Sequence, residues 1–336
     1  MLIDSYNRKL DYIRVSITDR CNLRCIYCMP PEGVDWKPHD SMLTFEEILR
    51  LCRIMADLGI KKIKVTGGEP LVRRGLAAFV KSLKALPGIE KVTLTTNGLL
   101  LGAYLDETET LFPNSLPDGV NISLDALKAD RYKRIARIPL IEDSDPEKIL
   151  PCIDRLIEKN IPVKLNCVPV RSYNEEEILP LAALAKSRNI AVRFIELMPM
   201  GSAAGLKPVT GNETAALLEK VYGALTPLSG VFGNGPAVYY SLPGFTGKIG
   251  FINPVSHGFC ETCNRLRLSS DGFLKPCLSS DLALDLKTLI RGSAPDTQLA
   301  EAIIEAAAKK PRFHTFSHIY GAAPAEHSGG MFGIGG

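Results

Sequence analysis

The chain has 336 residues, with 40 Lys and Arg against 37 Asp and Glu, so its formal net charge is +3. This near balance argues against a nonspecific nucleic-acid coat, and no apolar run has the length of a membrane span. The length predicts one large or two modest domains, and 46% hydrophobic residues suffice for a real core. The first residues lack the basic and apolar regions of a secretory signal, so we expect a cytoplasmic protein without nucleic-acid or membrane partners.

The first two hundred residues alternate short apolar strands with helical stretches. Strands are expected at 11–18, 61–66, 90–96, 119–124, 161–168 and 189–197, and helices at 44–58, 74–86, 146–160 and 174–188. Thr44 and Glu47 have the spacing of a capping box, and Gly59 follows the end of that helix. Connections long enough for helices favour parallel strands. The expected fold class is therefore α/β, a partial (β/α)6 barrel of the TIM type.

Polar and cationic side chains recur on one face of these strands, because successive strand residues point to opposite faces. The members of this face are Arg14, Ser16, Thr18, Lys62, Lys64, Thr66, Thr93, Thr95, Asn97, Asn121, Ser123, Asp125, Lys164, Asn166 and Arg193. The exposed face of an antiparallel sheet would show the same alternation. The helical connections instead favour a hollow barrel, whose cationic lining would take a large anion such as a triphosphate.

Three cysteines, Cys21, Cys25 and Cys28, lie in the loop after the first strand with the spacing C-x3-C-x2-C. Three thiolates this close can hold three corners of an iron–sulfur cube and leave the fourth iron open to a small molecule. A structural zinc site usually closes with four ligands, and no fourth ligand is obvious nearby. The odd total of nine cysteines favours metal ligands over disulfides.

This spacing, with Tyr27 before the last cysteine, resembles the radical S-adenosylmethionine (SAM) enzymes. The resemblance implies that the open iron binds the amino and carboxylate groups of SAM. Reductive cleavage of SAM would then give a 5′-deoxyadenosyl radical. The sequence Gly-Gly-Glu-Pro at 67–70 follows a strand and precedes a helix. It matches the segment that contacts the amino group of SAM in these enzymes.

The composition changes after Met200, so the expected domains are 1–200 and 201–336. The second segment should contain helices at 212–223, 281–292 and 295–310 and a hairpin over 237–252. It also carries a second triplet, Cys260, Cys263 and Cys277, and a zinc site closed by His257 is an alternative to a second cluster here. Arg265 and Arg267 share one face if extended and can bind phosphate or guanine oxygens.

With both triplets considered, the chain resembles the GTP 3′,8-cyclases, the radical SAM enzymes of molybdenum-cofactor biosynthesis. The resemblance rests on residues 14–21, 65–70, 94–98, 121–125, 193–196 and 260–277 and on the Gly-Gly terminus. It implies two [4Fe–4S] clusters, one on each triplet, with the guanine base at the open iron of the second. It also implies that Gly335 and Gly336 enter the barrel.

The same resemblance assigns binding residues. It implies SAM contacts from Tyr27, Gly68, Ser123 and Met198, and GTP contacts from Arg14, Lys62, Lys64, Thr95, Lys164, Arg193, Arg265, Leu266 and Arg267. It implies catalytic roles for Cys21, Cys25 and Cys28 and for Arg265 and Arg267. At Lys64 we expect Arg in some relatives. Lys keeps the charge there but loses the planar fork.

The implied reaction converts GTP to (8S)-3′,8-cyclo-7,8-dihydroguanosine 5′-triphosphate, the first step of molybdopterin biosynthesis. The adenosyl radical takes the C3′ hydrogen, and the C3′ radical then attacks C8 of guanine. Implied partners are an electron donor such as flavodoxin or ferredoxin, the downstream cyclic pyranopterin monophosphate synthase, and a second copy in a homodimer. The alternatives are a peptide-modifying radical SAM enzyme with an auxiliary cluster and a zinc-stabilised binding module.

Overall fold

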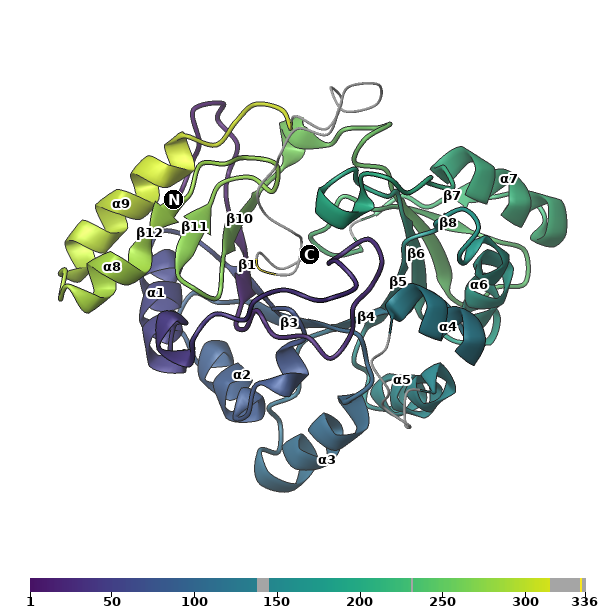
Figure 1. Cartoon of the computed structure of the whole chain (residues 1–336), viewed down its shortest axis with the longest axis horizontal. Coiled ribbons are helices and arrows are strands. Elements are labelled where there is room, and N and C mark those ends of the chain that lie inside the picture. The colour runs from purple at the N-terminus through teal and green to yellow at the C-terminus, as the bar shows by residue number, and fades with distance from the viewer. Residues whose placement is uncertain (138–144, 231, 315–332, 334–336) are drawn as a thin grey trace.

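The structure is a computed structural model that describes residues 1–137, 145–230, 232–314 and 333. Its strands form one sheet in the order β12-β11-β10-β1-β2-β3-β4-β5-β6-β9-β8-β7. Their bounds are β1 Tyr12–Ser16, β2 Lys62–Thr66, β3 Lys91–Thr96, β4 Val120–Ser123, β5 Val163–Cys167, β6 Ala191–Ile195, β7 Thr226–Pro227, β8 Val238–Ser241, β9 Lys248–Ile252, β10 Arg265–Leu268, β11 Phe273–Lys275 and β12 Leu284–Asp285. Figure 1 shows the sheet as an arc with helices on its outer side.

The helices alternate with the strands, as the sequence pattern predicts. Their bounds are α1 Phe45–Asp57, α2 Leu76–Lys84, α3 Leu101–Leu111, α4 Ala129–Ala136, α5 Ile149–Glu158, α6 Ile178–Ser187, α7 Gly211–Tyr222, α8 Leu286–Arg291 and α9 Asp296–Ala308. The predicted capping box is present: the Thr44 side chain accepts a hydrogen bond from the Glu47 backbone N–H, and the Glu47 side chain accepts one from the Thr44 N–H. Within the described ranges, no helix is both long and apolar enough to cross a membrane.

The predicted parallel arrangement is confirmed, because each neighbouring pair from β1 to β6 is parallel. The antiparallel alternative is therefore wrong for this part of the sheet. The predicted hairpin is the antiparallel pair β8–β9. The last third of the chain extends both edges, since β10 pairs parallel with β1 and β9 pairs parallel with β6. The two expected segments thus share a single sheet.

Several elements differ from the expectations. The helices α3 and α4 and the strands β10 and β11 were not predicted, and the expected helix at 281–292 begins with the short strand β12. The expected helices at 146–160 and 174–188 each start with a 3-10 turn, at Pro146–Lys148 and Glu175–Glu177. The terminal Gly335 and Gly336 lie outside the described residues.

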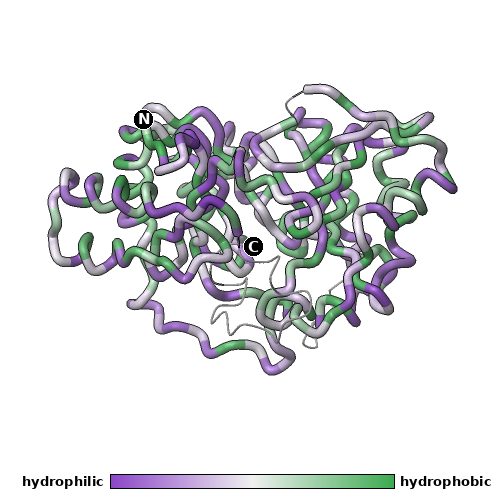
Figure 2. The backbone as a smooth tube through the Cα atoms, turned by 90° about the horizontal axis from the view of Figure 1, so that it is seen from above, coloured by the Kyte–Doolittle hydropathy of each residue, from purple (hydrophilic) through white to green (hydrophobic). Residues whose placement is uncertain are grey.

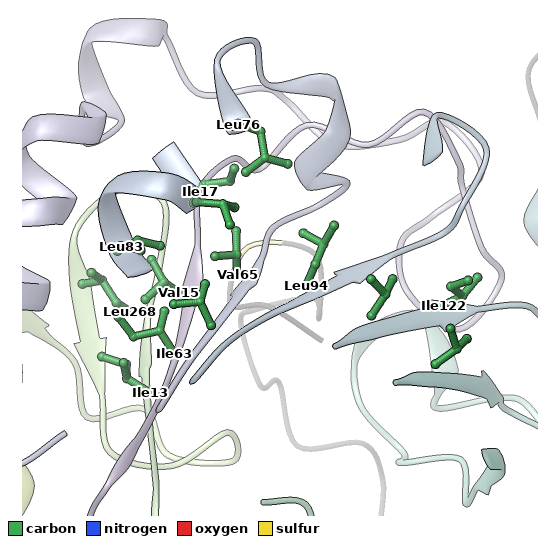
Figure 3. Close-up of a cluster of buried hydrophobic side chains, with 14 of the residues drawn as sticks. Ile13, Val15, Ile17, Ile63, Val65, Leu76, Leu83, Leu94, Ile122 and Leu268 are labelled. Carbon is green, nitrogen blue, oxygen red and sulfur yellow. The ribbon is translucent and has the colours of Figure 1, made fainter. Parts of the chain in front are cut away.

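One face of the sheet packs against the helices. The side chains of Ile13, Val15 and Val65 are fully buried there, and Figure 3 shows them in one cluster with Leu76 and Leu83 of α2. These residues alternate along their strands with the polar residues of the other face. Figure 2 shows the same interleaving of hydrophilic and hydrophobic residues along most of the chain. The core therefore lies between sheet and helices, and the polar face of the strands is left for a binding site.

Candidate active site

The polar face of the sheet lines a cavity of about 300 Å³. The cavity brings together both cysteine triplets and most of the other predicted site residues. The predicted residues that line it are Cys21, Cys25, Cys28, Cys260, Cys263, Cys277, Tyr27, Gly68, Ser123, Met198, Arg14, Lys64, Thr95, Arg193, Arg265 and Arg267. Segments that are more than two hundred residues apart in the chain thus meet at one site.

Three predicted GTP residues do not line this cavity. Lys62 forms an ion pair with Asp11, with 2.9 Å between Nζ and the carboxylate oxygen. The Lys164 Nζ donates a hydrogen bond to the carbonyl oxygen of Phe232. Leu266 is fully buried in the core. Leu266 lies between Arg265 and Arg267 in β10, so strand alternation directs its side chain away from the cavity.

The loop of the first triplet is fixed by the Gly-Gly-Glu-Pro turn. The N–H of Gly68 donates to the carbonyl oxygen of Thr18 at 2.7 Å, and the N–H of Glu69 donates to that of Arg20 at 2.7 Å. A Cβ atom on Gly68 would lie only 2.3 Å from the Arg20 oxygen. Only glycine allows this close approach, so the turn and the cysteine loop are held in contact.

Glu69 is a buried carboxyl group within this turn. One of its oxygens accepts hydrogen bonds from Thr96 Oγ1 at 2.7 Å and the Leu71 N–H at 3.0 Å, and the other accepts from the Asn97 N–H at 2.7 Å. Burial raises its pKa to about 7, against the effect of these hydrogen bonds. The carboxyl group is therefore rigidly held and would gain from a cationic ligand.

Tyr27 is fixed by Asp125, which lies just after β4. The phenol donates a hydrogen bond to one oxygen of Asp125 at 2.5 Å, and the other oxygen accepts from the Val168 N–H at 2.8 Å. Burial raises the pKa of Asp125 to about 6. The aromatic ring next to Cys28 is thus held in one orientation at the cavity wall.

Several cations also line the cavity. Arg14 and Lys64 are register partners in β1 and β2. Burial, and then the neighbouring charges of Arg14 and Arg193, hold the pKa of Lys64 well below its usual range. Arg193 is positioned by Asn166 at 2.9 Å and Asn121 at 2.7 Å. The sequence pattern places Asn121 and Asn166 on the polar face, but it does not predict that they position Arg193.

The second triplet is surrounded by cations from three segments. Arg265 donates a hydrogen bond to the Cys263 sulfur at 3.6 Å. Burial opposes the ionisation of Cys263, but the charges of Arg265 and Lys310 outweigh it and lower its pKa to about 7. Arg8 donates to the carbonyl oxygen of Cys260 at 2.6 Å. Sequence reasoning missed Arg8 and Lys310, because neither lies in a strand or next to a cysteine.

The cysteines and His257 also bear on the zinc and disulfide alternatives, which metal analysis decides. All nine cysteines are free thiols. Over the ranges that the structure describes, no three His, Cys, Asp or Glu side chains are placed to hold a single metal ion. His257, the fourth ligand in the zinc alternative, has its Nδ1 3.2 Å from the hydroxyl of Ser256.

Comparisons with known proteins agree with this geometry. The Radical SAM superfamily model matches residues 15–185, and the Molybdenum Cofactor Synthesis C model matches residues 190–316. A GTP 3′,8-cyclase of Clostridium perfringens (strain SM101 / Type A) is 44% identical over 93% of this chain and 94% of its own length. One of Syntrophomonas wolfei subsp. wolfei is 40% identical over 100% of both chains.

Among solved structures, Streptococcus suis SuiB has a TM-score of 0.58 at 13% identity, over 93% of this chain and 69% of that one. The similarity to SuiB concerns the fold, and it agrees with the α/β barrel and its C-terminal extension. The close sequence relatives and both family models carry the assignment further. This chain belongs to the GTP 3′,8-cyclase family of the radical SAM superfamily.

Proposed function

We propose that this chain is a lyase that converts GTP to (8S)-3′,8-cyclo-7,8-dihydroguanosine 5′-triphosphate. One observation carries the proposal: two cysteine triplets and a group of cationic side chains line the same cavity. In this proposal Cys21, Cys25 and Cys28 hold one [4Fe–4S] cluster, and Cys260, Cys263 and Cys277 hold another. When bound, the first cluster and SAM supply the 5′-deoxyadenosyl radical that removes the C3′ hydrogen of GTP.

The residues present fit these groups. The first triplet offers three thiols from the loop after β1. The second offers two thiols before β10 and one after β11. Three thiols close together are the donor set of an iron–sulfur cluster with one open iron. The cationic lining needs an anionic ligand, because buried positive charges are costly without a counter-charge. Thr95 supports the same conclusion. Its hydroxyl oxygen is buried and has no hydrogen-bond partner among the described residues, so a ligand in the cavity can bond to it.

Each end of the cavity has its own task. Near the first triplet, Tyr27, Gly68, Ser123 and Met198 contact SAM, and the Glu69 carboxylate lies in the same turn as Gly68. Arg14, Lys64, Thr95, Arg193, Arg265 and Arg267 contact GTP, and Lys164 adds positive charge near this set, whereas the charge of Lys62 is paired with Asp11. The hydrogen bonds of Arg193 to Asn121 and Asn166 orient its guanidinium before GTP binds.

The proposal extends to partners. The reductive step needs an electron donor such as flavodoxin or ferredoxin, and the cyclised product needs a cyclic pyranopterin monophosphate synthase to consume it. We also propose a homodimer. Sedimentation of the reconstituted chain tests the dimer, and turnover with reduced flavodoxin in place of dithionite tests the donor.

The deciding experiment is an anaerobic assay of the reconstituted chain with SAM and dithionite. It follows 5′-deoxyadenosine with GTP, with ATP and without nucleotide, and it identifies the nucleotide product by mass spectrometry. We expect GTP alone to drive 5′-deoxyadenosine release together with a cyclised product. SAM cleavage that is indifferent to GTP would keep the radical chemistry and refute the substrate, as the peptide-modifying alternative requires. Zinc in place of iron would refute both.

A further inference from the structure

Lys310, which follows α9, is a buried cation beside the second triplet. Its side chain is only 3% exposed and lines the cavity. Its Nζ donates hydrogen bonds to the carbonyl oxygens of Arg265 at 2.9 Å and Pro276 at 2.6 Å. Arg265 lies two residues after Cys263, and Pro276 directly precedes Cys277. Lys310 therefore joins the two segments that carry these cysteines.

The charge of Lys310 has no carboxylate partner in the described ranges, where both of its hydrogen-bond acceptors are neutral carbonyl groups. A buried ammonium group is costly without a counter-charge. The groups near Lys310 that can carry negative charge are the thiols of Cys263 and Cys277. A cluster bound by thiolates is anionic, and its net charge is one of the factors that set its reduction potential.

Arg8 provides an informative contrast on the same triplet. It donates to the carbonyl oxygen of Cys260 and, at 2.7 Å, to that of Pro311. Unlike Lys310, however, Arg8 forms a buried ion pair with Asp4 at 2.5 Å. The charge of Arg8 is thus compensated within the protein, so its role is to hold the loop. The charge of Lys310 remains available to the ligand of the triplet.

We propose that Lys310 is a positioning residue for the second cluster, which holds the Cys263 and Cys277 segments together and stabilises the cluster's reduced state. The inference rests on the proposed function in one respect, namely that the second triplet holds a cluster. One-electron reduction adds a negative charge to the cluster, and a buried cation favours that added charge. Loss of the cation should therefore shift the reduction potential to more negative values.

The test uses the full chain with Cys21→Ala, Cys25→Ala and Cys28→Ala, so that only the second cluster can form. Each variant is reconstituted anaerobically, its iron and sulfide are measured, and its potential is determined by dithionite titration followed by electron paramagnetic resonance. Lys310→Met keeps the length of the side chain and removes the charge. We expect its reduction equilibrium constant to fall at least tenfold, a shift of about 59 mV for one electron.

Two further variants separate charge from folding. Lys310→Arg keeps the charge and should restore the potential. Lys309→Met is the matched control, because Lys309 is the neighbouring residue and pairs with the exposed Glu305. It should leave iron content and potential unchanged. Circular dichroism spectra of all variants verify that the fold is retained.

Every outcome decides the inference. A lowered potential in Lys310→Met, or loss of iron there with iron retained in Lys310→Arg, supports it. An unchanged potential in Lys310→Met overturns the role of the charge. Equal loss of iron in both variants overturns it as well, because the cation of Lys310→Arg would not suffice, and it would leave Lys310 only the role of holding the two segments together. If the parent chain binds no iron at the second triplet, the proposed function itself fails and the inference with it.

Discussion

Arg14 and Lys64 are register partners in the parallel strands β1 and β2, so two cations lie side by side on the face that lines the cavity. Parallel strands with cations in register are electrostatically unfavourable in the apoprotein. The depressed pKa of Lys64 reports this cost, since burial and the charge of Arg14 both disfavour its protonated form. An anion bound in the cavity stabilises the positive charges of both Arg14 and Lys64.

The first prediction is that Lys64→Met stabilises the apoprotein and weakens GTP binding. Removing the charge relieves a repulsion on the order of 1 kcal/mol and should raise the melting temperature. It also removes a charged hydrogen bond to GTP worth about 1.5–3 kcal/mol, a loss of roughly 10- to 100-fold in affinity. Differential scanning calorimetry and equilibrium GTP binding measure the two effects.

Lys61→Met is the control for this change, because Lys61 is exposed and forms an ion pair with Glu90. It should alter GTP affinity very little. A Lys64→Met chain that binds GTP as tightly as the parent would show that Lys64 does not contact the nucleotide. A less stable Lys64→Met apoprotein would show that the cation has a structural partner.

The second prediction concerns the contact between Gly68 and the loop of the first triplet. Gly68→Ala would place a methyl group 2.3 Å from the Arg20 carbonyl oxygen, so the cysteine loop must move. We expect iron in the reconstituted chain to fall from about eight to about four atoms, as one [4Fe–4S] cluster is lost, together with SAM binding. Iron analysis and equilibrium dialysis with labelled SAM measure these losses.

Gly205→Ala is the matched control, because a Cβ atom at Gly205 meets nothing within 4 Å. Its iron content and SAM affinity should equal those of the parent chain. Full iron content in Gly68→Ala would mean that the loop tolerates the displacement, and that the close approach does not position the cysteines.

Strand alternation was the most informative feature of the sequence. It placed Arg14, Lys64 and Arg193 on one face, and all three line the cavity. It also placed Lys62 and Lys164 on this face, but neither lines the cavity: Lys62 lies at the start of β2 and pairs with Asp11, and Lys164 donates to the carbonyl oxygen of Phe232. Parity thus gives the face of a residue but not its height along the strand, and height decides which cations reach the ligand.

The last third of the chain was less predictable, because its strands depend on distant partners. Residues 265–268 form β10 by pairing with the nearby β11 and with β1, which lies more than two hundred residues earlier. Lys310 shows the same limit, since nothing local distinguishes it from its exposed neighbour Lys309. Its role arises from carbonyl groups of Arg265 and Pro276, which the fold brings to it.

The third prediction is that Cys263 is the most reactive thiol of the two triplets near neutral pH. The charges of Arg265 and Lys310 lower its pKa to about 7, whereas burial raises the pKa of Cys21 to about 11 and that of Cys28 to about 12. Because the thiolate is the nucleophile, iodoacetamide should label Cys263 first in the anaerobic apoprotein. Mass spectrometry over a pH series should give a midpoint near pH 7.

Arg265→Gln should move this midpoint upwards and slow the labelling at pH 7. Arg312→Gln is the control, since Arg312 is exposed and its side chain lies over the Phe313 ring. A Cys263 midpoint at the ordinary thiol value of about 8.5 would contradict the prediction, and so would an unchanged midpoint in Arg265→Gln.

The fourth prediction is that Glu69 makes the apoprotein less stable as the pH rises from 4.5 to 7. Burial raises the folded-state pKa of Glu69 from 4.5 to about 7, so the folded chain holds a proton that the unfolded chain releases. The contribution of Glu69 to the free energy of unfolding is therefore largest below pH 4.5 and falls by up to about 3 kcal/mol by pH 7. Glu69→Gln should remove this fall. Its amide N–H opposite a backbone donor costs free energy equally at every pH, so it lowers the whole curve without restoring the slope.

Urea unfolding at pH 5, 6 and 7 distinguishes the two chains, and Glu90→Gln, at an exposed site paired with Lys61, should keep the slope of the parent. Equal slopes for the parent and Glu69→Gln would show that the carboxyl group is already ionised at pH 5.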